Sequence, residues 1–245
     1  MIRYFASLVI YALVASIWMP SPAAADELSD AIRQAEEAKA ESQRLSRSAE
    51  EGRSKARQLY EETKFVKFQL AAENYVSASS RFDRAADAFH RAGYYLERAR
   101  STGNPSLLDD AQSNFREAGD HYNEGIQHAR RAGERFNGGI EEYNRQLRDE
   151  RKRKADANRT DAFNLMKSIE GMTKKIEGKS RSSEAVSCLK GAHSRAQWAF
   201  GEFHSAVNNA EQAETYKEKT QKGIQYYNQA VQMVKQAREK GKCTS

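Results

Sequence analysis

The chain has 245 residues, of which 30% are charged and 39% are hydrophobic, and its formal net charge is +6 at pH 7. This balance is expected when narrow apolar seams lie between solvated helix faces, whereas a compact globule of this length would bury a larger apolar share. A charge this mild allows weak contact with anionic envelope surfaces, although a solvated helix exterior explains it more simply.

Residues 1–25 have the features of a signal peptide. Arg3 supplies a short positive start, residues 4–19 are mostly apolar, and Ala23-Ala24-Ala25 offers the small side chains that a signal peptidase requires. We therefore expect cleavage after Ala25 and a mature protein that is periplasmic or secreted. An uncleaved N-terminal anchor is the alternative interpretation, although the apolar run is short for a membrane span, which needs about 20 residues.

From residue 26 onwards, apolar residues recur at alternating three- and four-residue steps, and Pro105 is the only proline after residue 22. This spacing predicts long amphipathic α-helices. We expect a single all-α domain over 26–245, in which three helical regions at about 26–100, 106–177 and 184–241 form an elongated antiparallel helical bundle or coiled coil.

The first helical region, 26–100, carries an apolar seam that changes phase. The seam runs to Leu70 and resumes, in a new phase, as Ala71, Tyr75, Ala78, Phe82, Ala85, Phe89, Ala92, Leu96 and Ala99. A change of phase rotates the apolar stripe around the helix, so we expect a local bend or rotation near residues 66–71.

Residues 101–106 form the clearest turn, because Gly103 permits a positive φ and Pro105 removes a backbone donor. In the second region, each glycine of Gly138-Gly139 costs about 1 kcal/mol relative to alanine, which predicts a kink or a very close helix contact. Residues 148–161 are highly polar and fit either a solvated helix or a loop. Antiparallel folding about the turn would place them opposite the polar segment 46–59, which favours a continuous helix.

The third region, 184–241, follows a turn at 178–183 and contains both cysteines. An exported chain with two cysteines favours a Cys188–Cys243 disulfide. One straight helix would separate them by about 82 Å, whereas a disulfide requires Cα atoms within about 7 Å. The bridge therefore requires a hairpin that folds back near residues 215–220, and the straight and folded alternatives both stay open.

One group of side chains has spacings seen at metal sites. Glu117, His121, Glu124 and His128 follow at steps of four, three and four, which places them on one helix face, and the antiparallel register would bring His90 close to Glu117. Ferritin-like bundles bind metals with similar pairs but use a second copy of the motif, which this chain lacks. Solvated helix surface is the simpler interpretation, so we expect no metal site or cofactor.

Two further patterns point to alternatives that we disfavour. The motif Phe82-x-x-Ala-Ala-Asp-x-Phe89 is echoed 33 residues later by Phe115-x-x-Ala-Gly-Asp-x-Tyr122, a period near that of helical solenoids, but no turn interrupts residues 71–100. The basic run 151–154 would suggest nucleic acid in a cytosolic protein, whereas after a signal peptide it indicates a solvated segment or contact with anionic polymers.

No phosphate-binding loop, nucleophile elbow or Cys-x-x-Cys pattern occurs in the chain, so we expect no enzyme. The sequence predicts an exported helical scaffold, spacer or adaptor that acts through protein–protein contacts in the cell envelope or a secretion apparatus, with self-association as another way to close its seams. A metal- or small-ligand-binding helical bundle is the alternative. Aromatic side chains supply much of interface energy, so candidate partner anchors are Tyr94, Tyr95, Trp198, Tyr226 and Tyr227.

Overall fold

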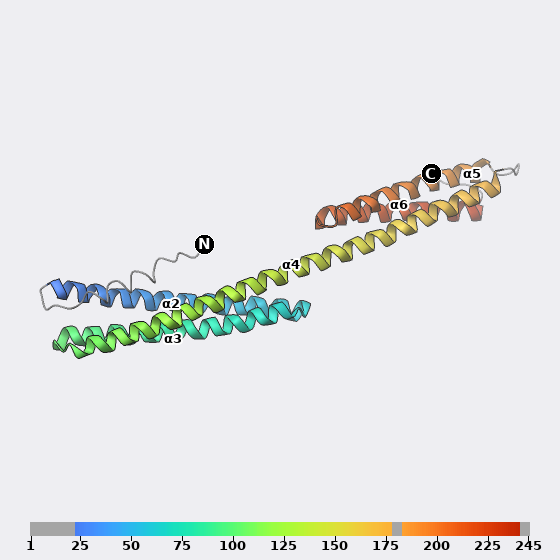
Figure 1. Cartoon of the computed structure of the whole chain (residues 1–245). Coiled ribbons are helices and arrows are strands. Elements are labelled where there is room, and N and C mark those ends of the chain that lie inside the picture. The colour runs from blue at the N-terminus through green and yellow to red at the C-terminus, as the bar shows by residue number, and fades with distance from the viewer. Residues whose placement is uncertain (1–22, 178–182, 241–245) are drawn as a thin grey trace. The chain divides into compact units, whose positions relative to one another are not determined.

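The structure, a computed structural model, describes residues 23–177 and 183–240 (Figure 1). Every element in these ranges is an α-helix: α2 (Ala23–Thr63), α3 (Val66–Thr102), α4 (Ser106–Ile176), α5 (Ser183–Asn208) and α6 (Ala213–Lys240). The all-α prediction is thus confirmed for the described residues. None of these helices is both long and apolar enough to cross a membrane. The predicted signal peptide lies almost wholly outside the described ranges and stays a prediction.

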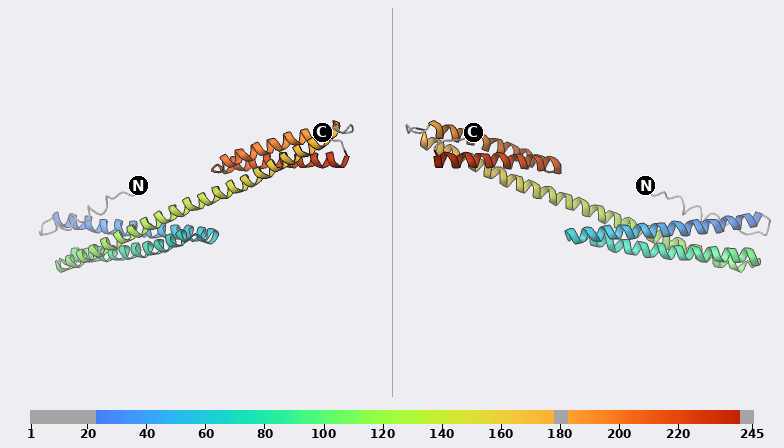
Figure 2. Two further views of the ribbon diagram at one scale, coloured as in Figure 1. Left: turned by 45° about the vertical axis from the view of Figure 1, so that its right-hand side comes forward. Right: turned by 180° about the vertical axis from the view of Figure 1, so that it is seen from behind.

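The chain forms two compact units, one ending at Glu141 and the other beginning at Glu142. The first unit contains α2, α3 and the beginning of α4, and the second contains the remainder of α4 with α5 and α6. In each unit, two helices joined by a short connection lie side by side with a segment of α4 (Figure 2). Each unit is therefore a bundle of three helical segments.

The first predicted region is two helices rather than one. Helix α2 ends at Thr63, Lys64 adopts the left-handed conformation with a φ of 58°, and α3 begins at Val66. The Thr63 hydroxyl holds this junction, because it donates to the carbonyl of Leu59 at 2.7 Å and accepts from the backbone N–H of Phe65 at 3.3 Å. The expected bend near 66–71 is thus a full chain reversal a few residues earlier.

Helices α2 and α3 pack antiparallel after this reversal. The hydroxyl oxygens of Ser46 and Ser79 lie 2.9 Å apart in the buried interface, and the ring of Tyr75 covers Gly52 so closely that a Cβ there would lie 2.8 Å from it. The polar segment 46–59 therefore faces α3. Its predicted pairing with 148–161 is wrong, because Arg151 in that segment instead donates to the carbonyl of Ala210 at 3.2 Å.

The turn between α3 and α4 is confirmed where the sequence predicts it. Gly103 has a φ of 68°, and its N–H closes α3 by donating to the carbonyl of Ala99 at 2.9 Å. The Asn104 side chain then accepts from the backbone N–H of Ser106 at 3.1 Å, at the start of α4. These contacts satisfy backbone groups that a helix end would otherwise leave unpaired.

Ring contacts fix the antiparallel register of α3 and α4, close to the register expected. Phe89 packs on Phe115 with ring centroids 6.2 Å apart, and Phe82 packs on Tyr122 at 5.8 Å. These four aromatic residues are the ones that end the two copies of the echoed motif. The echo therefore comes from two complementary faces that pack together, and the uninterrupted α3 argues against a solenoid repeat.

The buried side chains of the first unit repeat every seven residues. Along α3 there are two such series, one of large side chains and one of alanines. Facing helices can approach closely because each small residue makes room for a ring from its neighbour. A Cβ on Gly139 would lie 2.7 Å from the ring of Phe68, so the close-contact prediction for Gly138-Gly139 is confirmed at Gly139. The buried small series are Ala35, Ser42, Ala49 and Ala56 in α2, and Ala71, Ala78, Ala85, Ala92 and Ala99 in α3.

Helix α4 continues through residues 148–161, so the helical alternative is correct there. The second unit is built around its later part. Ile169 is fully buried against Leu189 and Ala192 of α5 and Val234 of α6, and Phe203 packs with Ala162 and Tyr227 in a neighbouring cluster. A narrow core of this kind again uses small residues where helices approach one another.

The last predicted region, 184–241, is a hairpin of two helices rather than one straight helix. Helix α5 ends at Asn208 and α6 begins at Ala213, so the reversal lies slightly before the expected 215–220. Asn209 supports the turn by donating from its side-chain amide to the carbonyl of Ser205 at 2.8 Å. Cys188 is buried with its Sγ 3.3 Å from the carbonyl oxygen of Met233. Cys243 lies outside the described residues, so the Cys188–Cys243 bridge stays a prediction.

Candidate functional site

The acidic and histidine side chains considered for a metal site lie on one face of α4, as the spacing predicts. Arginine side chains from α3 pair with them. Glu124 pairs with Arg81 at 2.8 Å. The Arg81 guanidinium also lies 3.2 Å from Nδ1 of His121. Glu117 makes an ion pair with Arg91 at 2.9 Å. A cation beside each carboxylate repels a metal ion. These side chains are therefore better explained as contacts that hold α3 and α4 together.

The two outer members of the proposed metal set do not complete it. The expected approach of His90 to Glu117 is shifted by one residue, because Glu117 contacts Arg91 while Nδ1 of His90 lies 3.3 Å from the Lys39 ammonium of α2. Nδ1 of His128 is buried with no hydrogen-bond partner. Over the described ranges 23–177 and 183–240, no group of three histidine, cysteine or acidic side chains is arranged to hold a metal ion.

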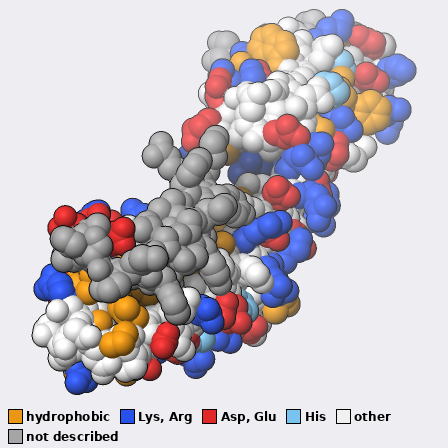
Figure 3. Space-filling view, turned by 60° about the vertical axis from the view of Figure 1, so that its left-hand side comes forward, with side chains coloured by type: hydrophobic (Ala, Val, Ile, Leu, Met, Phe, Trp, Pro, Cys, Tyr) orange, Lys and Arg blue, Asp and Glu red, His pale blue; other side chains and the backbone are white. Residues whose placement is uncertain are grey.

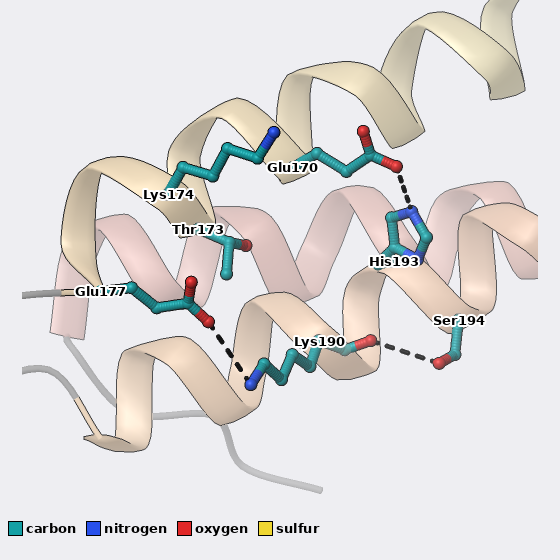
Figure 4. Close-up of a pocket in the computed structure, with 7 residues that line it drawn as sticks. All are labelled: Glu170, Thr173, Lys174, Glu177, Lys190, His193 and Ser194. Carbon is teal, nitrogen blue, oxygen red and sulfur yellow. Dashed lines mark hydrogen bonds and ion pairs between the residues drawn. The ribbon is translucent and has the colours of Figure 1, made fainter.

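A polar depression of about 370 Å³ lies between α4 and α5 in the second unit (Figure 4). Two polar contacts cross it: Oε1 of Glu170 lies 3.0 Å from Nε2 of His193, and Oε1 of Glu177 forms an ion pair with Nζ of Lys190 at 3.4 Å. These contacts link α4 to α5. Sequence patterns offer no reason to select His193 or its partner Glu170, because their proximity depends on the register of the two helices.

The chemistry available in this depression is limited. A carboxylate beside an imidazole can orient a general base, but covalent catalysis also requires a nucleophilic side chain within hydrogen-bond reach. The nearest candidate, the hydroxyl of Ser194, donates to the carbonyl of Lys190 at 3.2 Å, and Figure 4 shows it turned toward that carbonyl. The Thr173 hydroxyl likewise donates to the carbonyl of Ile169 at 2.9 Å. The depression is best explained by these two side-chain contacts between α4 and α5.

The basic run 151–154 is part of α4 rather than a free binding loop. Arg151 donates to the carbonyl of Ala210, and its guanidinium lies 6.0 Å from the ring centroid of Tyr216. Lys154 pairs with Glu150 at 2.6 Å within the same helix. Arg151 therefore links α4 to the connection between α5 and α6, and Lys154 forms an ion pair within α4. Both contacts agree with a solvated structural segment.

An exposed cation and aromatic cluster lies across α5 and α6. The Trp198 side chain is large and apolar, yet the residue is 50% exposed. Its ring meets that of Tyr226 edge to face, with centroids 5.5 Å apart. The Arg195 guanidinium lies 4.5 Å from the Trp198 centroid and 6.0 Å from that of Tyr226. We call Arg195, Trp198 and Tyr226 the aromatic cluster.

Ion pairs flank the aromatic cluster on both helices. Lys219 pairs with Glu202 at 3.3 Å, and Lys222 pairs with Glu218 at 2.7 Å. The hydrogen bond from Lys222 to Glu218 raises the pKa of the lysine and lowers that of the glutamate. The sequence singled out Trp198 and Tyr226 as possible anchors. It missed Arg195, whose only signal was its position one helical turn before a tryptophan.

The first unit contains a smaller arrangement of the same kind. Tyr94 is 51% exposed, its ring meets that of Tyr95 at 5.7 Å, and the guanidinium of Arg98 lies 5.8 Å from the Tyr94 centroid. Tyr95 packs against the buried core, whereas Tyr94 lies largely in solvent. On the face drawn in Figure 3, cationic and acidic side chains are interspersed, and hydrophobic ones occur in small separate groups.

No protein-family model, curated protein or solved structure matches this chain. The function of this protein must therefore be inferred from the chemistry of its own surfaces.

Proposed function

We propose that this protein is an exported, non-enzymatic helical scaffold or adaptor that acts through protein–protein contacts in the cell envelope or a secretion apparatus. The observation that carries the proposal is the aromatic cluster. Tryptophan, tyrosine and arginine are the residue types most enriched among the energetically dominant residues of interfaces. Here all three lie together, and burying Trp198 under a partner would remove a large apolar surface from water.

The packing of the two units supports the scaffold part of the proposal. Seven-residue series of small buried side chains are typical of helices that pack along their lengths, so we extend the proposal to the elongated, antiparallel coiled-coil arrangement. The depression between α4 and α5 supports the non-enzymatic part, because its two carboxylates already have side-chain partners on α5. Small-angle X-ray scattering would measure the maximum dimension of the protein.

The chain offers a matched pair of variants for testing the contact surface. Trp198→Ala removes the centre of the aromatic cluster, whereas Tyr94→Ala removes an equally exposed aromatic beside an arginine in the first unit. We would immobilise the wild type and both variants and quantify the proteins that each captures from the exported fraction. We expect a protein whose recovery falls about tenfold or more with Trp198→Ala and is retained with Tyr94→Ala.

A direct measurement should follow with the captured protein. The only tryptophans are Trp18 and Trp198, so export with cleavage after Ala25 leaves Trp198 as the single fluorescent tryptophan. Titration with the partner should then change its emission, and N-terminal sequencing should begin at Asp26. Equal capture by all three proteins, an intact leader in the exported fraction, or substrate turnover by the purified protein would contradict the proposal.

A further inference from the structure

A second surface, on α6, combines exposed apolar and cationic side chains. Steps of four and three residues place one continuous row along the outer side of this helix. From Lys217 to Arg238 its seven members are exposed and none is acidic, whereas the next position toward the helix start is the exposed Glu214. Ile224 and Val231 lie at the centre of the row and are 45% and 39% exposed. We call it the α6 strip: Lys217, Gln221, Ile224, Asn228, Val231, Lys235 and Arg238.

The neighbouring part of α4 extends this surface. The Arg238 guanidinium lies 3.3 Å from the Sδ atom of Met172, which places the end of the α6 strip beside α4. Met172 and Leu165 are partly buried against the core cluster that contains Val234. Lys175 lies one turn after Met172, so it occupies the same side of α4. The half-buried Met172 thus borders the Arg238 end of the α6 strip.

The cations around this surface differ from other cations of the second unit in their lack of acidic partners among the described residues. Elsewhere in the second unit, lysines such as Lys190 and Lys222 form ion pairs with glutamates. No carboxylate within the described ranges 23–177 and 183–240 forms an ion pair with Lys175, Lys217, Lys235 or Arg238. Two apolar side chains seven residues apart therefore share this surface with four cations, none of which forms an ion pair with a carboxylate of the described residues.

We propose that the α6 strip binds an acidic amphipathic helix of a partner protein. A helix lying along α6 presents side chains at the same seven-residue interval, so two of its apolar residues can cover Ile224 and Val231. Carboxylates on either side of them then meet the four cations. Complementary charge of this kind also orients the incoming helix and increases its association rate.

Two other occupants fit the surface less well. A second copy of this chain could offer only α2 as an acidic helix, but none of the exposed large hydrophobic residues of the described chain lies in α2. It would therefore leave Ile224 and Val231 uncovered. An anionic membrane would satisfy the cations, but stable insertion of a surface helix needs a much larger apolar face than two β-branched side chains.

The α6 strip is separate from the aromatic cluster. Ile224 and Tyr226 are two residues apart on α6, which is about 200° around the helix axis. Tyr226 faces Trp198 of α5, whereas the strip ends beside Met172 of α4. The inference therefore goes beyond the proposed function, and its test uses different residues.

The test uses a labelled peptide of about 20 residues, long enough to be helical in water. It has an alanine-rich background, two leucines seven residues apart and glutamates on both sides of them. A second peptide carries lysines in place of the glutamates. Fluorescence anisotropy would measure binding of each peptide to the purified full chain. We expect binding of the acidic peptide that weakens as salt is added, and no binding of the basic one.

Variants then locate the binding site. Lys217→Glu combined with Arg238→Glu should raise the Kd of the acidic peptide about tenfold or more, and Ile224→Ser combined with Val231→Ser should raise it similarly. Arg53→Glu combined with Lys55→Glu is the matched control, because it makes the same charge change on exposed residues of α2. Circular dichroism and melting curves would verify that each variant is folded.

Each alternative outcome would overturn the inference. These outcomes are equal binding of the two peptides, absence of binding by the wild type, and equal loss of affinity in the control and strip variants. Two further measurements address the other occupants. Vesicles containing phosphatidylglycerol that bind the wild type but not the Ile224→Ser/Val231→Ser variant would assign the strip to membranes. Self-association in sedimentation equilibrium that the same variant abolishes would assign it to a second copy.

Discussion

Helical glycines of this protein are of two kinds. They differ in whether a side chain from a neighbouring helix fills the space that a Cβ would take. At Gly125 in α4, a Cβ would lie 2.7 Å from the ring of Phe82, which is closer than packed carbon atoms allow. Gly133, eight residues further along the same helix, has no such neighbour within 4 Å. The first glycine is needed for close packing, whereas the second only weakens its helix.

We predict opposite effects of the same substitution at these two glycines. Gly125→Ala should destabilise the protein, because overpacking costs about 1–3 kcal/mol and exceeds the gain in helix propensity of about 1 kcal/mol. Gly133→Ala should raise the free energy of unfolding by up to about 1 kcal/mol, since it gains propensity without a clash. Chemical denaturation of both variants and the wild type would measure the difference. Effects of equal sign would contradict this account.

Two half-buried tyrosines predict how stability depends on alkaline pH. Burial raises the pKa of Tyr75 and, together with the nearby Glu41, that of Tyr122 above the ordinary value of 10.0. Above about pH 10 the unfolded chain loses these phenolic protons while the folded chain retains them. The unfolded state then binds fewer protons, so the free energy of unfolding falls as pH rises.

Tyr122→Phe should therefore make this alkaline loss of stability shallower, because a phenylalanine cannot ionise in the unfolded state. Denaturation measured from pH 8 to pH 11 would give the slope for the wild type, for Tyr122→Phe and for Tyr75→Phe. Each variant should lose less stability over this interval than the wild type. Parallel curves for all three proteins would show that burial of these phenols does not contribute to the pH dependence.

At the scale of helices, the connections differ in how visible they are in the sequence. Gly103 and Pro105 predict the turn between α3 and α4, because glycine permits a positive φ and proline lacks a backbone donor. The reversal between α2 and α3 places a lysine in the left-handed conformation, with no glycine or proline beside it. Such a turn depends on tertiary packing of the flanking helices, which local sequence rules cannot represent.

Lys64→Gly tests this interpretation of the α2 to α3 junction. A side chain in the left-handed conformation costs about 1–2 kcal/mol, and glycine avoids that cost, although its greater freedom in the unfolded chain offsets part of the gain. We expect a net increase in the free energy of unfolding, and a decrease for Lys64→Val, since a β-branched side chain tolerates this conformation poorly. A destabilised Lys64→Gly variant would show that the lysine side chain itself holds the junction.

The same distinction explains how much of the candidate site was predictable. The spacing of apolar residues indicated which helix faces are buried. Trp198 and Tyr226 stand out separately, because they are large aromatic residues. It could not place Arg195 over both rings, because that contact depends on the register between α5 and α6. The Glu170–His193 pair was missed for the same reason. Contacts across helices require a knowledge of register that periodicity within one helix does not supply.

At the scale of the whole molecule, the two units have separate buried cores. Phe82 packs with Ala49 and Ala78 in the first unit, whereas Ile169 packs with Leu189 and Val234 in the second. Each of these clusters draws its members from one unit only. Proteins with more than one core commonly unfold in more than one step, so stability in this chain should be distributed between two transitions rather than held in a single one.

Scanning calorimetry with one variant in each core tests this division. Phe82→Ala should remove about 3–5 kcal/mol and Ile169→Ala about 2–5 kcal/mol, because both side chains are almost fully buried and their loss leaves a cavity. We expect each substitution to lower the midpoint of a different transition and to leave the other nearly unchanged. A single transition that both variants lower equally would instead mean that α4, whose residues contribute to both units, couples their unfolding into one cooperative event.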